Sequence, residues 1–409
     1  MKRAWICGAL LLAFLTGCGS SASETPSPTE AAAAEHELRV VTLGGMPHEY
    51  MALIDGFHAS QDSWRIVLED CSDEEEQDRL RVELLTGGGP DGYLAGRTGF
   101  LQNLEQGGAL MDLRPSLERL GLASEDFAAA LRNDIQEAEA VHTLTCSYEL
   151  WGFTAPATLV GEKDHLTMAE AQDIAQEENI YLFNPDFFQD WLLEWVMVFS
   201  LGNYVDLDGG TCTLDSPDFA ALLEACKALR PEIDTNVRGS YENCLLYQLP
   251  MQNFRLYDSL CEQGRRIVGF PTDEGNGCTL YPLLRVAVSA TTNRLEGMEA
   301  FLDYCFSPVG QRALILGTGF PALQSELAAA VDDAVAGDTL LMLGGSLDRA
   351  DGDALLELVE ATEGTHVFDY TIESIIKEEA AAFFAGDKTA QETADLIQSR
   401  VSLYLGEQR

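Results

Sequence analysis

The sequence predicts an α/β protein of two lobes, each a mainly parallel sheet wrapped by helices. The chain has 409 residues, which is long for one compact core and sufficient for two. From residue 37 onward, short β-branched runs alternate with segments whose apolar residues recur at helical spacing. A β-α-β-α-β order of this kind is typical of a parallel sheet with helices on its faces.

The first elements can be assigned one by one. The β-branched run at 37–43 predicts a strand, and the apolar residues of 48–60 recur at helical spacing. WRIVLED at 64–70 predicts the second strand. A helix is expected at 73–87, because its first turn is acidic and the segment stops at a glycine. GYLAG at 92–96 predicts a third, short strand.

A glycine-rich stretch, LLTGGGPDGYLAG, occupies residues 84–96. A phosphate-binding loop needs Lys and Ser or Thr after its glycines, whereas Pro90 and Asp91 follow here, and proline lacks an amide donor. We therefore interpret the glycines as a helix C-cap and a turn that reverses the chain into the third strand.

The loops after the first and third strands are the expected ligand-binding loops. In open α/β sheets, ligands bind beyond the carboxyl ends of the strands, so both loops should face one crevice. Arg97 either binds a ligand hydroxyl or carboxylate, or pairs with a neighbouring acid. The candidate contacts in these loops are Gly45, Met46, Glu49, Gly96 and Arg97.

The charge of the chain limits its partners. It contains 67 acidic and 25 basic residues, a formal net charge of -42. Such a surface repels nucleic-acid phosphates and anionic lipid headgroups over a Debye length of roughly 8 Å at physiological salt. No nucleic-acid partner is expected, and strong acidity favours a soluble monomer.

The N-terminus predicts export and a lipid anchor on the extracellular face of the cell membrane. Two basic residues precede the apolar run at 4–15, which is too short to span a bilayer and suits a signal peptide. LTGC at 15–18 looks like a lipobox, so we expect residues 1–17 to be cleaved and Cys18 to carry acyl chains such as palmitate. Residues 18–36, rich in Ser, Pro and Ala, predict a flexible tether. The alternative is an ordinary secretory signal with an incidental cysteine.

Eight cysteines remain when Cys7 and Cys18 are set aside. None has CxxC spacing, and no group of His and Cys resembles a zinc site, so no metal and no cofactor are expected. Buried free thiols are favoured over a dense disulfide framework, because a chain of this length can bury a core without covalent links.

Four parts of the chain resemble the extracellular solute-binding proteins of ABC importers, family 1, the group that includes maltose-binding protein. The segment FFAGDKTAQETADLIQSRV is the most specific of them. The four parts are ELLTGGGPDGYLAG with the exit GGALMDL (83–96, 107–113), GFPTDEGNG with the strand and helices after it (269–277, 283–314), GTGFPALQSEL (317–327) and the closing segment (377–407).

This resemblance implies a type II periplasmic-binding-protein-like fold, in which two lobes joined by three hinge crossovers close on a small solute. It also implies delivery of the solute to the transmembrane subunits of an ABC permease, with the ATPase on a separate chain. The first crossing is expected near Thr143 to Tyr148 and the third at 317–327. The expected lobes are 37–143 plus 287–318 for lobe 1 and 144–286 plus 319–409 for lobe 2.

The middle of the chain, expected in lobe 2, is rich in Trp and Tyr. Sugar rings stack on aromatic rings while carboxylates and amides bind their hydroxyls, so a neutral sugar or oligosaccharide is the expected ligand. Trp191 and Trp195 are at i and i+4 on a predicted helix, which is also the pattern of a core stripe. The candidate contacts here are Trp191, Tyr241, Asn253 and Tyr281.

Other functions also fit parts of the sequence. A surface sensor or adhesin can use the same fold, and a lipoprotein glycoside hydrolase needs two carboxylates about 5 to 9 Å apart. Because 67 acids supply such a pair by chance, acid content does not indicate an enzyme. The sequence contains neither GxSxG nor HExxH, so we predict no catalytic residue and expect a binding protein.

Overall fold

The computed structural model describes most of the chain between residues 36 and 407. The described residues are 36–44, 47–71, 73–96, 98–161, 163–184, 189–207, 209–228, 243–248, 250–272, 275–362, 364–366 and 369–407. The predicted signal peptide, Cys18 and nearly all of the predicted tether lie outside them. Within the described residues, no helix combines the length and the apolar composition that a membrane span requires.

The first sheet has six strands in the order β12-β4-β11-β3-β1-β2. β1 pairs in parallel with β2 and with β3, as the β-α-β order of the sequence predicts. Val40 and Val41 of β1 belong to different apolar clusters, because successive side chains of a strand point to opposite faces. The strands are β1 (Glu37–Leu43), β2 (Arg65–Asp70), β3 (Gly92–Ala95), β4 (Leu144–Trp151), β11 (Thr279–Val288) and β12 (Phe320–Pro321).

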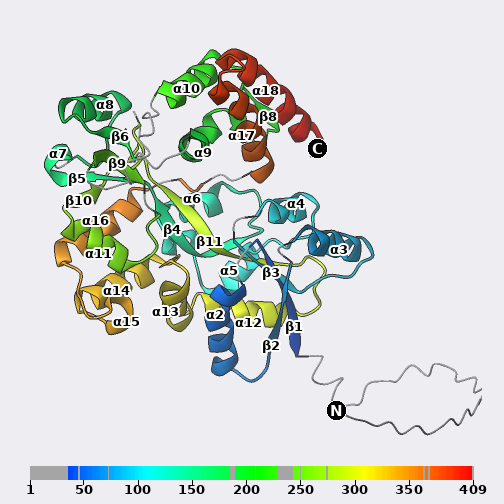
Figure 1. Ribbon diagram of the computed structural model, residues 1–409. Helices are drawn as coiled ribbons and strands as arrows, with labels where there is room; N and C mark the ends of the chain where they lie inside the picture. Colours follow the sequence, from blue (N-terminus) through cyan, green and yellow to red (C-terminus); the bar gives the residue numbers. More distant parts are fainter. Residues whose placement is uncertain are drawn as a thin grey trace, which may run out of the picture.

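Helices from several parts of the chain gather around this sheet (Figure 1). They are α2 (Pro47–Ser60), α3 (Glu74–Leu85), α4 (Phe100–Gln106), α5 (Arg114–Leu120), η1 (Ser124–Asp126), α6 (Ala129–Glu137), α11 (Phe254–Glu262), α12 (Leu295–Cys305), α13 (Pro308–Gly317), α14 (Gln324–Val335), α15 (Thr339–Met342) and α16 (Arg349–Glu360). We call the apolar residues between these helices and the six-stranded sheet the first core.

The glycine-rich stretch before β3 forms a helix end and a turn, as predicted. The Gly87 amide donates to the Leu84 carbonyl (3.1 Å), and Gly87 has a left-handed φ of 82°. Asp91, only 4% exposed, accepts hydrogen bonds from the Arg39 backbone amide (2.9 Å) and the Thr292 hydroxyl (2.6 Å). Its carboxylate thus joins β1 to the chain that follows β11, which is a structural role.

A second sheet of four strands has the order β10-β5-β9-β6, and a two-stranded ribbon pairs β7 with β8. These strands are β5 (Phe153–Pro156), β6 (Tyr181–Phe183), β7 (Val205–Asp206), β8 (Thr211–Cys212), β9 (Cys244–Gln248) and β10 (Arg265–Ile267). The accompanying helices are α7 (Ala157–Val160), α8 (Met168–Glu177), α9 (Gln189–Ser200), η2 (Leu201–Asn203), α10 (Pro217–Ala228), α17 (Tyr370–Ala385) and α18 (Ala390–Glu407). Their apolar residues form a second core.

Both sheets are mixed, so the prediction of mainly parallel sheets is wrong in this detail. β11 is antiparallel to β3 and to β4, and β12 is antiparallel to β4. In the second sheet only β6 and β9 are parallel. The β-α-β pattern of the first 95 residues predicts local parallel pairs, whereas β4, β11 and β12 enter the sheet from distant parts of the chain.

The two cores form two bodies, and the long strands β4 and β11 run between them (Figure 1). The chain passes from the first core to the second between Leu150 and Phe153, because β4 continues as one strand through Trp151. The crossing predicted near Thr143 to Tyr148 lies a few residues earlier in the chain and stays a prediction. The chain returns from β10 to β11 in the segment before Thr279.

The last crossing lies between α16 and α17, which pack in different cores. A crossing is predicted at 317–327, but Phe320 and Pro321 pair with β4 inside the first sheet, and α14 to α16 stay on the first core. The crossing at 317–327 stays a prediction. This packing differs from the expected lobe boundaries. We propose that 319–360 belongs to lobe 1 and that the chain rejoins lobe 2 only from α17 onward.

Candidate functional site

The carboxyl ends of β1 and β3 lie side by side. Leu43 pairs with Ala95, and the Gly96 amide donates to the Leu43 carbonyl (3.2 Å). The loops that follow both strands therefore begin at one edge of the sheet, where ligands of such sheets bind.

The structure describes part of the predicted ligand-binding set. The structure describes three of the predicted contacts completely: Gly96, Asn253 and Tyr281. It describes only the backbone of two others, Glu49 in α2 and Trp191 in α9. The predicted contacts outside the described residues are Gly45, Met46, Arg97 and Tyr241.

Arg285 on β11 connects this edge of the sheet to the neighbouring strands. Its Nη2 donates to the Gly96 carbonyl (2.8 Å), and the residue pairs in register with Ala95 of β3 and Thr145 of β4. Burial lowers the pKa of the guanidinium, and nearby negative groups, which include Glu105 and Asp134, oppose that shift. The positive charge of Arg285 therefore lies at the level where both parallel strands end.

Asp134 on α6 faces the crossing segment between α16 and α17. Its two carboxylate oxygens accept the Thr365 hydroxyl at 3.0 and 2.8 Å. Desolvation raises the pKa of Asp134 to about 6, although the Thr365 hydrogen bond and the charge of Arg285 act in the opposite direction. The residue is nonetheless exposed to solvent, and it lines a cavity on the protein surface.

A cavity of about 200 Å³ lies beside Asp134, lined also by Glu105, Thr143 and Thr145. We use the name junction site for the polar residues that meet here from α4, α6, β4, β11 and the crossing segment. Carboxylate acceptors, hydroxyls and a guanidinium together match the hydrogen-bonding groups of a polyhydroxylated ligand. The junction site consists of Glu105, Asp134, Thr145, Arg285 and Thr365.

An aromatic layer lies further along β4 and β11. Trp151 stacks on Tyr281, with ring centroids 4.3 Å apart and planes 6° apart, and the Glu149 carboxylate accepts the Trp151 indole N–H (2.6 Å). His366 stacks on Tyr281 (5.6 Å) and Trp195 contacts Trp151 (4.6 Å). All four rings are buried, and Trp151, Trp195 and Tyr281 belong to the second core. The core interpretation therefore holds for Trp195.

Asn253 lies apart from the junction site. Its side chain caps α11 by accepting the Leu256 amide (3.0 Å). It lines a small cavity of about 110 Å³ together with Leu316 and Leu340. The observed role of Asn253 is structural, and contact with a ligand stays a prediction.

Sequence reasoning did not single out Asp134, Arg285 or Trp151. Arg285 carries a usable signal, because it is a charged residue inside the apolar strand LLRVAV, and buried charges are rare unless paired. Asp134 carries none, since α6 contains several polar residues and only the tertiary fold shows which one meets Thr365.

The eight cysteines of the body are free thiols. Among the described residues, no three His, Cys, Asp or Glu side chains are grouped to hold a metal ion.

No protein-family model matches the chain, and no curated protein matches it. Solved structures do match. An extracellular solute-binding protein of family 1 from Alicyclobacillus acidocaldarius subsp. acidocaldarius has a TM-score of 0.62 at 12% identity, over 90% of this chain and 98% of that chain. The sugar-binding protein MalE from Xanthomonas citri has a TM-score of 0.67 at 14% identity, over 91% and 98%.

A third match is an ABC transporter solute-binding protein from Thermotoga lettingae bound with alpha-D-tagatose. Its TM-score is 0.55 at 14% identity, over 90% of this chain and 100% of that chain. Matches at such identities show the fold: the chain has the two-lobed α/β fold of type II solute-binding proteins over most of its length.

Proposed function

We propose that this chain is an extracellular solute-binding protein, anchored through lipid on Cys18, that captures a small solute between its lobes and delivers it to an ABC permease. The junction site carries the proposal, because its acids, hydroxyls and guanidinium meet where the chain crosses between two separate cores. The similarity in fold to proteins named for sugar binding supports it.

Hinge closure is the proposed mechanism. The Asp134 carboxylate on the first body bonds to Thr365, which belongs to the segment that leads into the second body. A solute that contacts both bodies binds the closed arrangement more tightly than the open one, and this difference in affinity drives closure.

The proposed ligand is a sugar or oligosaccharide. The hydroxyl groups of a sugar can form hydrogen bonds with the acids, hydroxyls and guanidinium of the junction site. Aromatic side chains from the second body are proposed to stack on the sugar rings. The proposed contacts remain Gly45, Met46, Glu49, Gly96 and Arg97 from lobe 1, and Trp191, Tyr241, Asn253 and Tyr281 from the middle of the chain.

A thermal-shift panel of oligosaccharides, amino acids, peptides and polyamines tests this function. One class of sugar should raise the melting temperature, and the same sugar should reduce the radius of gyration in small-angle scattering. Stabilisation by another class alone would overturn the carbohydrate assignment. An unchanged radius of gyration at saturation would overturn hinge closure.

The anchor and the permease need separate tests. Cys18→Ala should release the protein from the membrane fraction, whereas the control Cys7→Ala, in the same predicted signal, should stay membrane-bound. Retention of Cys18→Ala would contradict the lipid anchor. Cells that lack the gene for this protein should take up less of the identified sugar. If the protein closes on the sugar but its loss leaves uptake unchanged, a surface sensor is favoured instead.

A further inference from the structure

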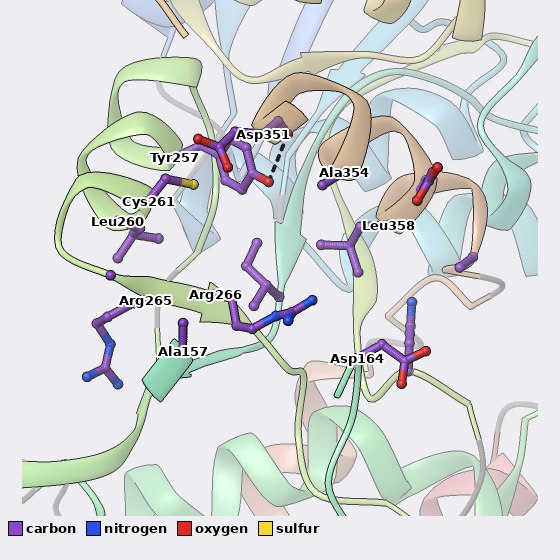
Figure 2. A pocket seen from close by; sticks show the side chains of 15 residues that line it. Ala157, Asp164, Tyr257, Leu260, Cys261, Arg265, Arg266, Asp351, Ala354 and Leu358 are labelled. Carbon is purple, nitrogen blue, oxygen red and sulfur yellow. Dashed lines mark hydrogen bonds between the residues drawn. The ribbon is translucent and has the colours of Figure 1, made fainter. Parts of the chain in front are cut away.

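A second cavity, of about 490 Å³, lies between α11, α16 and β10 (Figure 2). It shares no lining residue with the junction site. Its walls come from α11 and α16, which pack on the first core, and from β10, a strand of the second sheet whose Ile267 packs against the first core. Its volume lies in the range of small-molecule sites, about 300 to 1,000 Å³.

One part of the cavity wall is apolar. Leu260 of α11, Ile267 of β10 and Leu358 of α16 line it, and Ala354 lies one turn before Leu358. The lining residues of α16 recur every three or four positions from Asp351 to Ala361, so one face of that helix is turned to the cavity. This wall can bury an aliphatic or aromatic group.

Two adjacent arginines on β10 have different roles. Arg265 is buried, and its guanidinium donates to the Thr154 hydroxyl (3.0 Å) and the Leu245 carbonyl (2.9 Å), which is a structural role. Arg266 points the other way, toward the centre of the cavity in Figure 2, and its Nη1 donates to the Gly161 carbonyl (2.6 Å). One wall of the cavity therefore carries a positive charge.

The facing helices carry negative charge. Asp351 and Glu357 of α16 both line the cavity. Burial, and then the charges of Glu262 and Asp351, raise the pKa of Asp258 on the adjoining helix. Burial and the charge of Asp351 also raise the pKa of the Cys261 thiol to about 12, so this thiol stays neutral. An ammonium group near Asp351 would relieve the repulsion among these carboxylates.

We propose that this cavity binds a small zwitterion with a large apolar side chain, such as an amino acid of the phenylalanine or leucine type. Arg266 pairs with the carboxylate, Asp351 pairs with the ammonium, and the apolar wall of Leu260 and Leu358 covers the side chain. A neutral sugar offers no charge to either wall. The inference needs only this cavity and stands independently of the proposed function.

Isothermal titration calorimetry on the purified full chain tests the proposal with three matched probes: L-phenylalanine, phenethylamine, which lacks the carboxylate, and 3-phenylpropionate, which lacks the ammonium. L-phenylalanine should bind at least about tenfold more tightly than either of the others, since a charged hydrogen bond contributes roughly that much. Equal binding of phenethylamine, or binding of no probe, would overturn the zwitterion site.

Two charge variants locate the contacts. Arg266→Gln should weaken the binding of L-phenylalanine about tenfold and leave the binding of phenethylamine unchanged. Asp351→Asn should weaken the binding of phenethylamine and leave the binding of 3-phenylpropionate unchanged. The control Arg79→Gln removes an exposed arginine on α3 and should change nothing. Binding unaffected by both charge variants would refute the assignment.

A blocking variant separates this cavity from the interlobe site. Ala354 is exposed, so Ala354→Trp should fill the cavity without unfolding the chain, and its melting temperature checks this. L-phenylalanine binding should then disappear while sugar binding persists. Amino-acid binding that survives Ala354→Trp would place the ligand elsewhere and overturn the proposal.

Discussion

Replacement of Gly152 by alanine should destabilise the protein, because the crossing from β4 to β5 runs through a space that Cys278 already occupies. A Cβ at position 152 would lie 2.9 Å from the Cys278 Sγ, 3.4 Å from the Gly269 Cα and 3.6 Å from the Ile267 Cγ2. The backbone of Gly152 is outside the left-handed region, so the expected effect is steric.

The size of the effect follows from these contacts. The sulfur must move by several tenths of an ångström, and overpacking of this kind typically costs about 1 to 3 kcal/mol. In a body of about 200 residues, each kcal/mol lowers the melting temperature by roughly 2 to 4 °C. Gly152→Ala should therefore melt roughly 2 to 12 °C below the unsubstituted chain.

Differential scanning calorimetry of a double-mutant cycle provides the assay. Cys278→Ala removes the sulfur, so Gly152→Ala should cost much less in that background than alone. Gly202→Ala is the matched control, because a Cβ there meets nothing within 4 Å, and it should change stability by less than about 0.5 kcal/mol. The reasoning fails if Gly152→Ala costs the same with and without Cys278.

Four further predictions concern polar contacts of the first body. Burial raises the pKa of Asp134 to about 6, above an unfolded value of roughly 3.9. Its stabilising contribution is therefore complete below about pH 4 and lost as the pH rises through 6, so the melting temperature should decline relative to Asp134→Asn over that interval. Thr365→Val removes a hydrogen bond that lowers this pKa, and carboxyl-carbon NMR should show a higher midpoint; an unchanged midpoint would contradict the contact. Asp91→Ala leaves two donors without their acceptor and should cost about 2 to 4 kcal/mol in urea unfolding, whereas a loss under about 1 kcal/mol would argue against its structural role. Arg285→Met removes positive charge near Asp134, so the same NMR titration should again give a higher midpoint for Asp134. Calorimetry of this variant with the identified sugar should show weaker binding. An unchanged affinity would exclude Arg285 from the solute site.

The early elements of the fold are predictable because each has a local signal. The β-branched runs, the acidic first turn of α3 and the glycines after it all act within a few residues, and the structure confirms them. The crossings lack such a signal. β4 is buried at every position except Thr145, so nothing in its sequence marks the point between Leu150 and Phe153 where one core ends and the other begins.

The candidate site is predictable only where a topological rule applies. The position of Gly96 is predictable from the rule that ligand loops begin where parallel strands end. In the structure Gly96 directly follows β3, beside the end of β1. Asp134 and Arg285 approach each other from elements 150 residues apart, which no local pattern can show. Tyr281 was expected to be available to a ligand, but it is buried because Trp151 of the neighbouring strand stacks on it.

The cavity between α11, α16 and β10 makes the chain a candidate for two-input control. Since β10 is a strand of the second sheet while α11 and α16 pack on the first core, the proposed hinge closure would change the shape of the cavity. Under the proposed hinge closure, an effector bound there favours one angle, and thermodynamic reciprocity requires that it change the affinity for the proposed solute by the same factor by which that solute changes the affinity for the effector. With a typical coupling of about 5- to 150-fold, the amount of sugar carried would report the concentration of a second, unrelated nutrient.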